Sequence, residues 1–233
     1  MESARTVRTW RRRAADLRDS VNFRLRPPDW SEEVTRDLPF GEAAVERYID
    51  DLASCRTYLE YGSGSSTLWA VEAGCQVVTV ESDASFLASL EGRCRKVARP
   101  ADAGSMSFIH ADIGRTGLWG VPSTRLSASH QRARWAAYPM APWVTLGRDF
   151  RADLILVDGR FRVACALAVV LMQGDSEWRL LFDDYADRQE YWPIERFADL
   201  VELRGRMAVF QPKSGVDLVE AGAAYDAFGA DWR

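Results

Sequence analysis

A carboxylate, two glycines and a run of hydroxyl side chains lie close together in residues 60–67 of the 233-residue chain. Gly62 and Gly64 carry no side chains, so a ligand can approach the main chain closely at either position. The pair stands between an apolar run and a helix-like run, a setting in which backbone N–H groups at a helix start hold a bound group. We therefore expect a small-molecule site at this turn, with Glu60 just before it.

Acidic residues also follow the other apolar runs in the central part of the chain. Because the carboxyl ends of parallel strands share one edge of a sheet, ligands bind beyond that edge, near the point where the strand order reverses. The full set of acids therefore predicts a shared cleft. The alternative is that the acids only mark strand ends and helix caps, which explains any single position but not the set. The acids are Glu60, Glu81, Asp112, Asp158 and the adjacent pair Asp183 and Asp184.

The spacing between the turn and the second acid favours a ribose-bearing cofactor. Glu81 follows Gly62 by about 20 residues, the offset at which an acid meets a ribose diol in nucleotide-binding folds. Thr67 stands where a dinucleotide fingerprint would have its third glycine. A bound pyrophosphate is therefore less well supported than a ribose.

Short apolar runs alternate with helix-like segments, and this alternation predicts how the acids are positioned. It indicates a doubly wound, mostly parallel α/β sheet with helices on both faces. Two last runs, RMAVFQ and GVDLVEA, are expected to form an antiparallel C-terminal strand pair. The expected strands span residues 57–62, 76–82, 107–113, 152–159 and 178–185, and the expected helices span residues 65–73, 84–97, 160–172 and about 187–202.

The chain length suits one domain with additions. Residues 1–54, including a helical stretch at 3–20, are expected to form an N-terminal helical extension, and residues 55–233 a single domain. Residues 114–151 are expected to form an irregular aromatic insertion, because long aromatic loops are usually functional. Within it, Trp143 is a candidate wall of the substrate pocket and His130 a candidate general base.

The composition of the chain gives no sign of a nucleic-acid partner, a metal or redox site, or a membrane-spanning helix. The formal net charge is -4, so no overall basic field points to nucleic acid. The four cysteines form no CxxC pair, which favours reduced core cysteines in a cytoplasmic protein over a metal or redox site. No run reaches the about 18 apolar residues of a membrane-spanning helix. Residues 1–54 are a candidate surface for packing on a second copy of the chain.

Five segments, in order, resemble the successive motifs of class I (Rossmann-like) S-adenosylmethionine-dependent methyltransferases: LEYGSGSS, VVTVESD, FIHADI, LILVDG and LLFDDY. The resemblance covers residues 57–185. It implies S-adenosyl-L-methionine as the cofactor and methyl transfer to a small molecule, with oxygen the expected acceptor atom. The alternatives are a dinucleotide or nucleotide-sugar enzyme on a Rossmann sheet, and an inactive methyltransferase-like binding protein.

The resemblance also implies roles for individual residues. The turn at Gly62 and Gly64 would approach the methionine part of the cofactor, with Glu60 near its amino group. Glu81 would accept hydrogen bonds from the ribose hydroxyls. Asp112 would meet the adenine amino group. The expected cofactor-binding residues are Glu60, Gly62, Ser63, Gly64, Glu81, Ser82, Asp112, Ile113 (against the adenine ring) and Asp158.

The last two motifs are similar to those of catechol and macrocin-type O-methyltransferases. This implies a Mg²⁺ ion held by Asp158, Asp183 and Asp184, which would lower the pKa of an acceptor hydroxyl. Asp158 is in addition the expected catalytic residue. The alternative is that Asp158 closes a turn and Asp183 caps a helix.

Three further residues are expected to contact the substrate. Arg160 and Arg162 follow Asp158 directly and could clamp a carboxylate or phosphate. Pairing of these arginines with Asp183 or Asp184 is the alternative, and it would argue against a metal. Tyr185 follows the last acid pair and completes the candidate substrate-binding residues.

Overall fold

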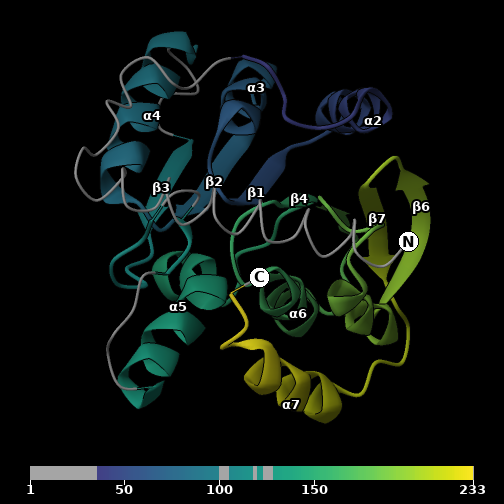
Figure 1. Cartoon of the computed structure of the whole chain (residues 1–233). Helices are drawn as coiled ribbons and strands as arrows, with labels where there is room; N and C mark the ends of the chain where they lie inside the picture. The colour runs from purple at the N-terminus through teal and green to yellow at the C-terminus, as the bar shows by residue number, and fades with distance from the viewer. Residues whose placement is uncertain (1–35, 100–104, 118–119, 123–127, 233) are drawn as a thin grey trace, which may run out of the picture.

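A computed structural model of the chain describes residues 36–99, 105–117, 120–122 and 128–232 (Figure 1). Its centre is a seven-stranded sheet in the order β3-β2-β1-β4-β5-β7-β6. The first five strands pair in parallel, whereas β7 runs antiparallel to both β5 and β6. The predicted doubly wound α/β class is confirmed. The strands are β1 (Thr57–Tyr61), β2 (Gln76–Glu81), β3 (Met106–His110), β4 (Leu154–Val157), β5 (Arg179–Phe182), β6 (Ala198–Arg204) and β7 (Met207–Pro212).

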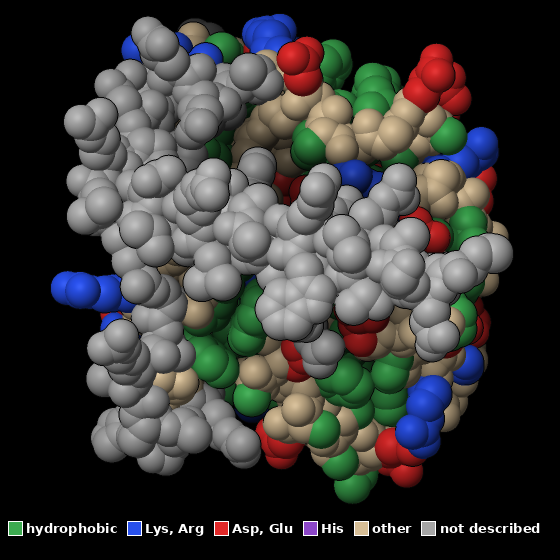
Figure 2. Space-filling view, viewed as in Figure 1, with side chains coloured by type: hydrophobic (Ala, Val, Ile, Leu, Met, Phe, Trp, Pro, Cys, Tyr) green, Lys and Arg blue, Asp and Glu red, His purple; other side chains and the backbone are tan. Residues whose placement is uncertain are grey.

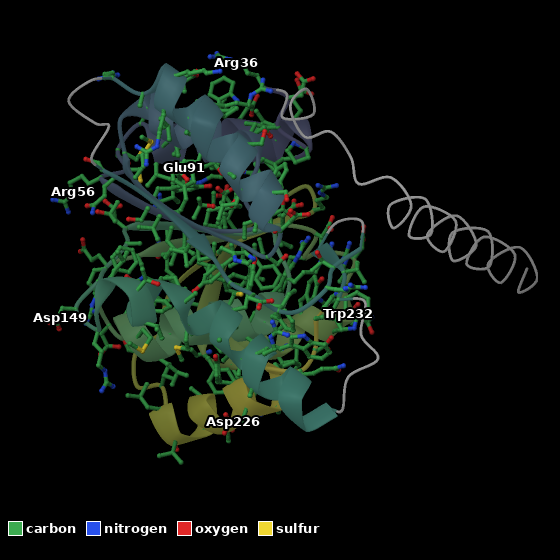
Figure 3. The ribbon with its side chains drawn as sticks, turned by 90° about the vertical axis from the view of Figure 1, so that its left-hand side faces the viewer. Arg36, Arg56, Glu91, Asp149, Asp226 and Trp232 are labelled. Atoms are coloured by element: carbon green, nitrogen blue, oxygen red, sulfur yellow. The ribbon has the colours of Figure 1, made fainter. Side chains whose placement is uncertain are left out.

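Helices cover both faces of this sheet. One buried cluster joins the sheet to α2, α3 and α4, and another joins it to α5, α6 and α7. Glu91 on α4 and Asp226 on α7 accordingly lie on opposite sides of the sheet (Figure 3). The helices are α2 (Glu42–Leu52), α3 (Ser65–Ala73), α4 (Ala84–Val97), α5 (Ala128–Leu146), α6 (Arg162–Gln173) and α7 (Leu218–Phe228), with a 3₁₀ helix η2 at Gln189–Arg196.

The central strands are apolar on both sides because each face is covered. Tyr58 and Leu59 are both fully buried, yet they belong to the two different clusters. This explains the nearly continuous apolar runs of the sequence. The strand order reverses between β1 and β4, so the ends of these two strands define the point where a ligand is expected.

The irregular insertion expected at 114–151 is wrong for residues 128–146. They form α5, the helix that connects β3 to β4, and Tyr138 and Trp143 on it are buried against the sheet. Pro139 and Pro142 lie inside this helix. Prolines usually end a helix, so the sequence pattern indicated a loop where packing against the sheet maintains a helix.

The C-terminal expectations were partly wrong. An antiparallel pair is present, but it consists of β6 and β7. The helix expected at 187–202 is replaced by η2 and β6. The strand expected at 215–221 is instead a turn followed by the first residues of α7, which begins at Leu218. Asp217 caps α7 by accepting hydrogen bonds from the backbone of Val219 and Glu220, and this capping signal was missed.

The N-terminal extension is described only in its last part. Residues 1–35, with the helix expected at 3–20, lie outside the described residues. Helix α2 follows and packs on the sheet through Tyr48, which is fully buried. Within the described ranges, no helix combines the length and the apolar character that crossing a membrane requires.

Candidate functional site

The turn after β1 brings two strand-end loops into direct contact. Gly62 has φ +92°, and a Cβ atom there would lie 2.5 Å from the Cα atom of Gly159, just after β4. Only glycine fits such a position. A Cβ atom on Gly64 would instead approach no closer than 4.0 Å to Ser66 Oγ. Gly62 therefore serves the packing of two loops, which the sequence did not predict, while Gly64 leaves open space beside the main chain.

Glu60 stabilises this turn through hydrogen bonds to the residues that follow it. It is fully buried, and its carboxylate accepts hydrogen bonds from the hydroxyls of Ser66 and Thr67 at the start of α3. Thr67 Oγ1 in turn accepts the backbone N–H of Gly64 at 3.0 Å. Burial raises the pKa of Glu60 to about 8, although the two hydroxyls lower it. Direct contact of Glu60 with a cofactor remains a prediction, but its role in shaping the turn is visible.

The change of the free energy of unfolding with pH should show whether Glu60 is protonated in the folded protein. Its ordinary pKa is 4.5, so between pH 4.5 and about pH 8 the folded protein holds a proton that the unfolded chain has lost. The free energy of unfolding is therefore expected to fall as the pH rises through this window. Glu60→Gln has no such proton, so its melting temperature should fall less steeply with pH than that of the wild type.

The control for this experiment is Glu46→Gln, because Glu46 is exposed on α2. The melting temperature of this control should fall with pH as steeply as that of the wild type. Melting curves recorded at several pH values give the comparison. A Glu60→Gln protein with the wild-type slope would show that Glu60 is ionised in the fold.

Glu81 joins the end of β2 to the same turn. One carboxylate oxygen accepts the backbone N–H of Ser63 at 3.3 Å. The other accepts the Ser82 hydroxyl at 3.0 Å and the Asp83 backbone N–H at 2.9 Å. Burial raises the pKa of Glu81. The expected neighbourhood of Glu81 and the glycine turn is thus present in the structure.

The residues after β3 take two different positions. Asp112 is exposed; it accepts the backbone N–H of Gly114 at 2.9 Å and pairs with Arg134. The Gly114 backbone and the Arg134 guanidinium lower the pKa of Asp112. Ile113 is buried in the core, and its carbonyl accepts the indole N–H of Trp135 at 3.0 Å. Asp112 thus lies at the open edge, whereas Ile113 lies beneath it.

The three acids predicted to bind Mg²⁺ are paired with arginines. Asp183 accepts two hydrogen bonds from Arg206, at 3.0 and 2.8 Å. Asp184 accepts one from Arg188 at 2.5 Å and lies 3.3 Å from Arg206 Nε. A cation would have to displace these guanidinium groups, so the pairing does not fit a Mg²⁺ ion.

Asp158, the third predicted ligand, is paired as well, with Arg162 Nη2 at 3.0 Å. In the part of the chain that the structure describes, no group of three His, Cys, Asp or Glu side chains is arranged to hold a metal ion. Arg162 Nη1 also lies 3.5 Å from Asp184 Oδ2, so the alternative of pairing between Arg162 and this acid applies. The side chains present therefore do not fit the predicted magnesium site.

Asp158 nevertheless has an unusual environment. Its side chain is 22% exposed. Burial raises its pKa to about 7; Arg162 lowers the pKa, and the nearby carboxylates of Asp183 and Asp184 raise it. A carboxyl group that titrates near neutral pH is suited to general base catalysis.

Arg162 is a structural residue and not a substrate clamp. Its guanidinium donates to the backbone carbonyls of Gly159 at 3.0 Å and Asp183 at 2.6 Å, and it is 4% exposed. It therefore ties the loops after β4 and β5 together. Arg160 remains a candidate because it is partly exposed beside the same loop.

The other substrate predictions need correction. Trp143 is buried, and its indole donates to the carbonyl of Phe150, before the amino end of β4, away from the cleft. Tyr185 is buried against Phe182 and donates its hydroxyl to Glu195 at 2.6 Å. Trp143 was expected to line the pocket because it lies in the aromatic insertion, and Tyr185 because it follows the last acid pair. His130 lies in the first turn of α5, and its side chain is outside the described part of the structure.

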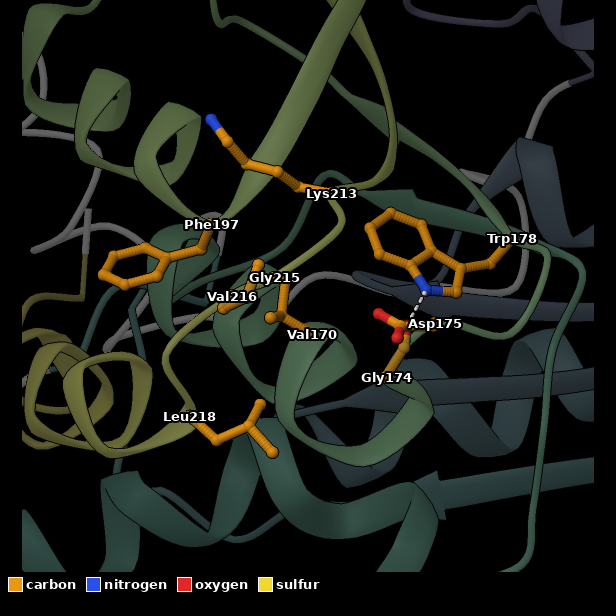
Figure 4. A pocket seen from close by; sticks show the side chains of 9 residues that line it. All are labelled: Val170, Gly174, Asp175, Trp178, Phe197, Lys213, Gly215, Val216 and Leu218. Atoms are coloured by element: carbon orange, nitrogen blue, oxygen red, sulfur yellow. Dashed lines mark hydrogen bonds between the residues drawn. The ribbon is translucent and has the colours of Figure 1, made fainter.

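A cavity of about 160 Å³ lies elsewhere in the molecule, between the end of α6 and the loop before α7 (Figure 4). Trp178, Phe197 and Lys213 are among the residues that line it. None of the predicted site residues does. The cavity is therefore separate from the strand-end site.

The parallel sheet with its reversal point, the glycine turn and the adjoining Glu81 define a protein of the Rossmann-like α/β class. A crystal structure of a methyltransferase-like protein from Silicibacter pomeroyi has a TM-score of 0.73 and 32% identity, over 84% of this chain and 97% of that chain. The chain belongs to this methyltransferase-like family and has the fold of class I (Rossmann-like) S-adenosylmethionine-dependent methyltransferases. No family model matches the chain, and no curated protein matches it.

Two other solved structures are much less similar. The CcbJ methyltransferase from Streptomyces caelestis has a TM-score of 0.33 and 15% identity, over 67% of this chain and 52% of that chain. The glycopeptide N-methyltransferase MtfA, complexed with sinefungin, has a TM-score of 0.36 and 15% identity, over 75% of this chain and 67% of that chain. Neither similarity is high enough to support a statement about this chain.

Proposed function

We propose that the protein transfers a methyl group from S-adenosyl-L-methionine to an oxygen atom of a small molecule. The observation that carries the proposal is the contact between Glu81 and the Ser63 N–H, which closes the turn after β1 against the end of β2. This contact lies beside the reversal point of the sheet, where cofactors bind in such folds.

Each strand end has a role in this proposal. Glu81 accepts hydrogen bonds from the ribose hydroxyls, and Asp112 accepts a hydrogen bond from the adenine amino group. The open main chain at Gly64 admits the methionine part, whose carboxylate meets the N–H groups at the start of α3. When bound, the cofactor supplies an electrophilic methyl group on a positively charged sulfur.

Asp158 acts as the general base. Its carboxylate accepts the proton that the acceptor hydroxyl loses, and its pKa of about 7 suits this task near neutral pH. Arg162 fixes the orientation of the carboxylate by donating to Oδ1. The protein supplies alignment of the two reactants, which can contribute much of the rate.

A small acceptor agrees with the charge of the molecule. The net charge is -4, and acidic and basic side chains are interspersed over the described part of the surface in Figure 2. A nucleic-acid substrate would require a basic stripe that neutralises phosphates.

Thermal unfolding with different ligands tests the proposal. S-adenosylhomocysteine at about 100 times its dissociation constant stabilises a protein by about 2.7 kcal/mol. In a domain of this size that corresponds to a rise of about 5–10 °C in Tm. We expect this rise with S-adenosylhomocysteine and no rise with NAD⁺. A rise with NAD⁺ alone would favour a dinucleotide enzyme instead.

A further inference from the structure

One face of α5 contacts the strand ends that form the site. Arg134, Trp135 and Tyr138 lie on that face, at the spacing of neighbours on a helix surface. Arg134 pairs with Asp112, and the indole of Trp135 donates to the carbonyl of Ile113. Both partners come directly after β3, so this helix supports the expected adenine side of the site.

Tyr138 reaches further, to the junction of β1, β2 and β4. Its hydroxyl donates to the carbonyl of Val80 at 3.3 Å, and the backbone N–H of Gly62 donates to the same carbonyl at 3.0 Å. Burial raises the pKa of Tyr138, and the nearby backbone of Arg160, after β4, lowers it. One buried hydroxyl thus connects the ends of three strands.

The fit around this hydroxyl is tight. A Cβ atom on Gly159 would lie 2.5 Å from the Tyr138 hydroxyl and 2.8 Å from the backbone nitrogen of Gly62. The Tyr138 ring is also held, since it packs against Tyr61 and Phe161 with ring centroids 6.0 and 5.7 Å apart. The hydroxyl is therefore confined to one position.

The shared carbonyl lies one residue before Glu81. The Glu81 carboxylate accepts the N–H of Ser63, one residue after Gly62. The Tyr138 hydroxyl consequently helps to fix the positions of Val80 and Gly62. Val80 adjoins the proposed ribose subsite at Glu81, and Gly62 adjoins the proposed methionine subsite. Its loss would leave the Val80 carbonyl held by the Gly62 N–H alone and would free the Gly159 loop to shift relative to the turn.

We propose that Tyr138 is a positioning residue for the cofactor: its hydroxyl holds the glycine turn and Glu81 in the arrangement that binds S-adenosyl-L-methionine. The inference rests on the proposed function. Tyr138 does not touch the cofactor and acts only through Val80, Gly62 and Gly159.

Tyr138→Phe tests this, with Tyr225→Phe as the matched control. Tyr225 lies on α7 and donates its hydroxyl to the carbonyl of Ala136 at 2.7 Å, so it also anchors α5, but away from the glycine turn. Each variant loses one hydroxyl bonded to a backbone carbonyl, and both should lower Tm to a similar extent. Only Tyr138→Phe should weaken binding of S-adenosylhomocysteine in titration calorimetry, by about fivefold or more, the factor that one net hydrogen bond is worth.

A second variant serves if Tyr138→Phe fails to fold. Phe161→Leu removes the ring that packs against Tyr138, with ring centroids 5.7 Å apart, so that the Tyr138 hydroxyl is kept but is no longer confined. It should weaken S-adenosylhomocysteine binding in the same direction.

The outcomes separate the inference from the proposed function. Wild-type affinity in Tyr138→Phe, or in Phe161→Leu where that variant stands in, overturns the positioning role. An equal loss in Tyr225→Phe overturns it too, since the effect would then follow stability alone. If the wild type itself does not bind S-adenosylhomocysteine, the proposed function fails and this inference fails with it.

Discussion

Asp158→Asn is expected to lower the rate of methyl transfer by about 100-fold to 10,000-fold, the range that a positioned general base contributes. Asparagine cannot take the proton from the acceptor hydroxyl, although it keeps the size of the side chain and can still accept a hydrogen bond from Arg162. The measurement is turnover with any acceptor that the wild type methylates in a screen of phenols and sugars.

The pH profile separates loss of the base from loss of the fold. The pKa of Asp158 is raised from 3.8 to about 7, so its carboxylate form is gained as the pH rises through neutrality. Wild-type kcat/KM should therefore increase from about pH 6 to pH 8. Asp158→Asn should lack this rise and still bind S-adenosylhomocysteine like the wild type. An Asp158→Asn protein that keeps both the rate and the pH profile would show that another group takes the proton.

Glu81→Gln is expected to weaken binding of S-adenosylhomocysteine by about tenfold to 100-fold, because hydrogen bonds to a charged group are worth more than neutral ones. The Glu81 carboxylate accepts hydrogen bonds only, whereas glutamine places an amide N–H₂ among backbone donors such as Ser63 N and Asp83 N. Tm should also fall, so affinity is measured by titration calorimetry well below the melting range.

Glu91→Gln is the matched control for Glu81→Gln. Glu91 lies on α4 and pairs at the surface with Arg95, four residues later, and surface pairs of this kind contribute little. Its affinity for S-adenosylhomocysteine should equal that of the wild type. Unchanged affinity in Glu81→Gln would contradict the placement of the ribose at the end of β2.

The sequence was sufficient for the parallel core of the fold and for the neighbourhood of Glu81 and the glycine turn. Strands buried on both faces are nearly continuous apolar runs, and an acid at the end of such a run must lie at the carboxyl edge of the sheet. This is why Glu81 could be placed beside Gly62 without a structure.

Contacts between distant segments could not be predicted in the same way. The arginine pairs of Asp183 and Asp184 depend on Arg206, which lies in the hairpin between β6 and β7, outside the motifs. The role of Tyr138 depends on α5, which the prolines at 139 and 142 concealed. If that segment had been predicted to be a helix, the spacing would have placed Arg134, Trp135 and Tyr138 on one face of it.

Glycine positions illustrate the same limit. The sequence indicated that Gly62 is bare so that a ligand can approach. The structure shows that a side chain there would collide with Gly159. Sequence spacing identifies a position that excludes a side chain, but only the packed loops show which neighbour excludes it.

A crystal structure of the protein with S-adenosylhomocysteine tests the central claim most directly. We predict that the ribose hydroxyls lie within hydrogen-bonding distance of Glu81 and that the homocysteine part lies along the open main chain at Gly64. A nucleoside bound elsewhere, for example in the cavity beside Trp178, would contradict the account.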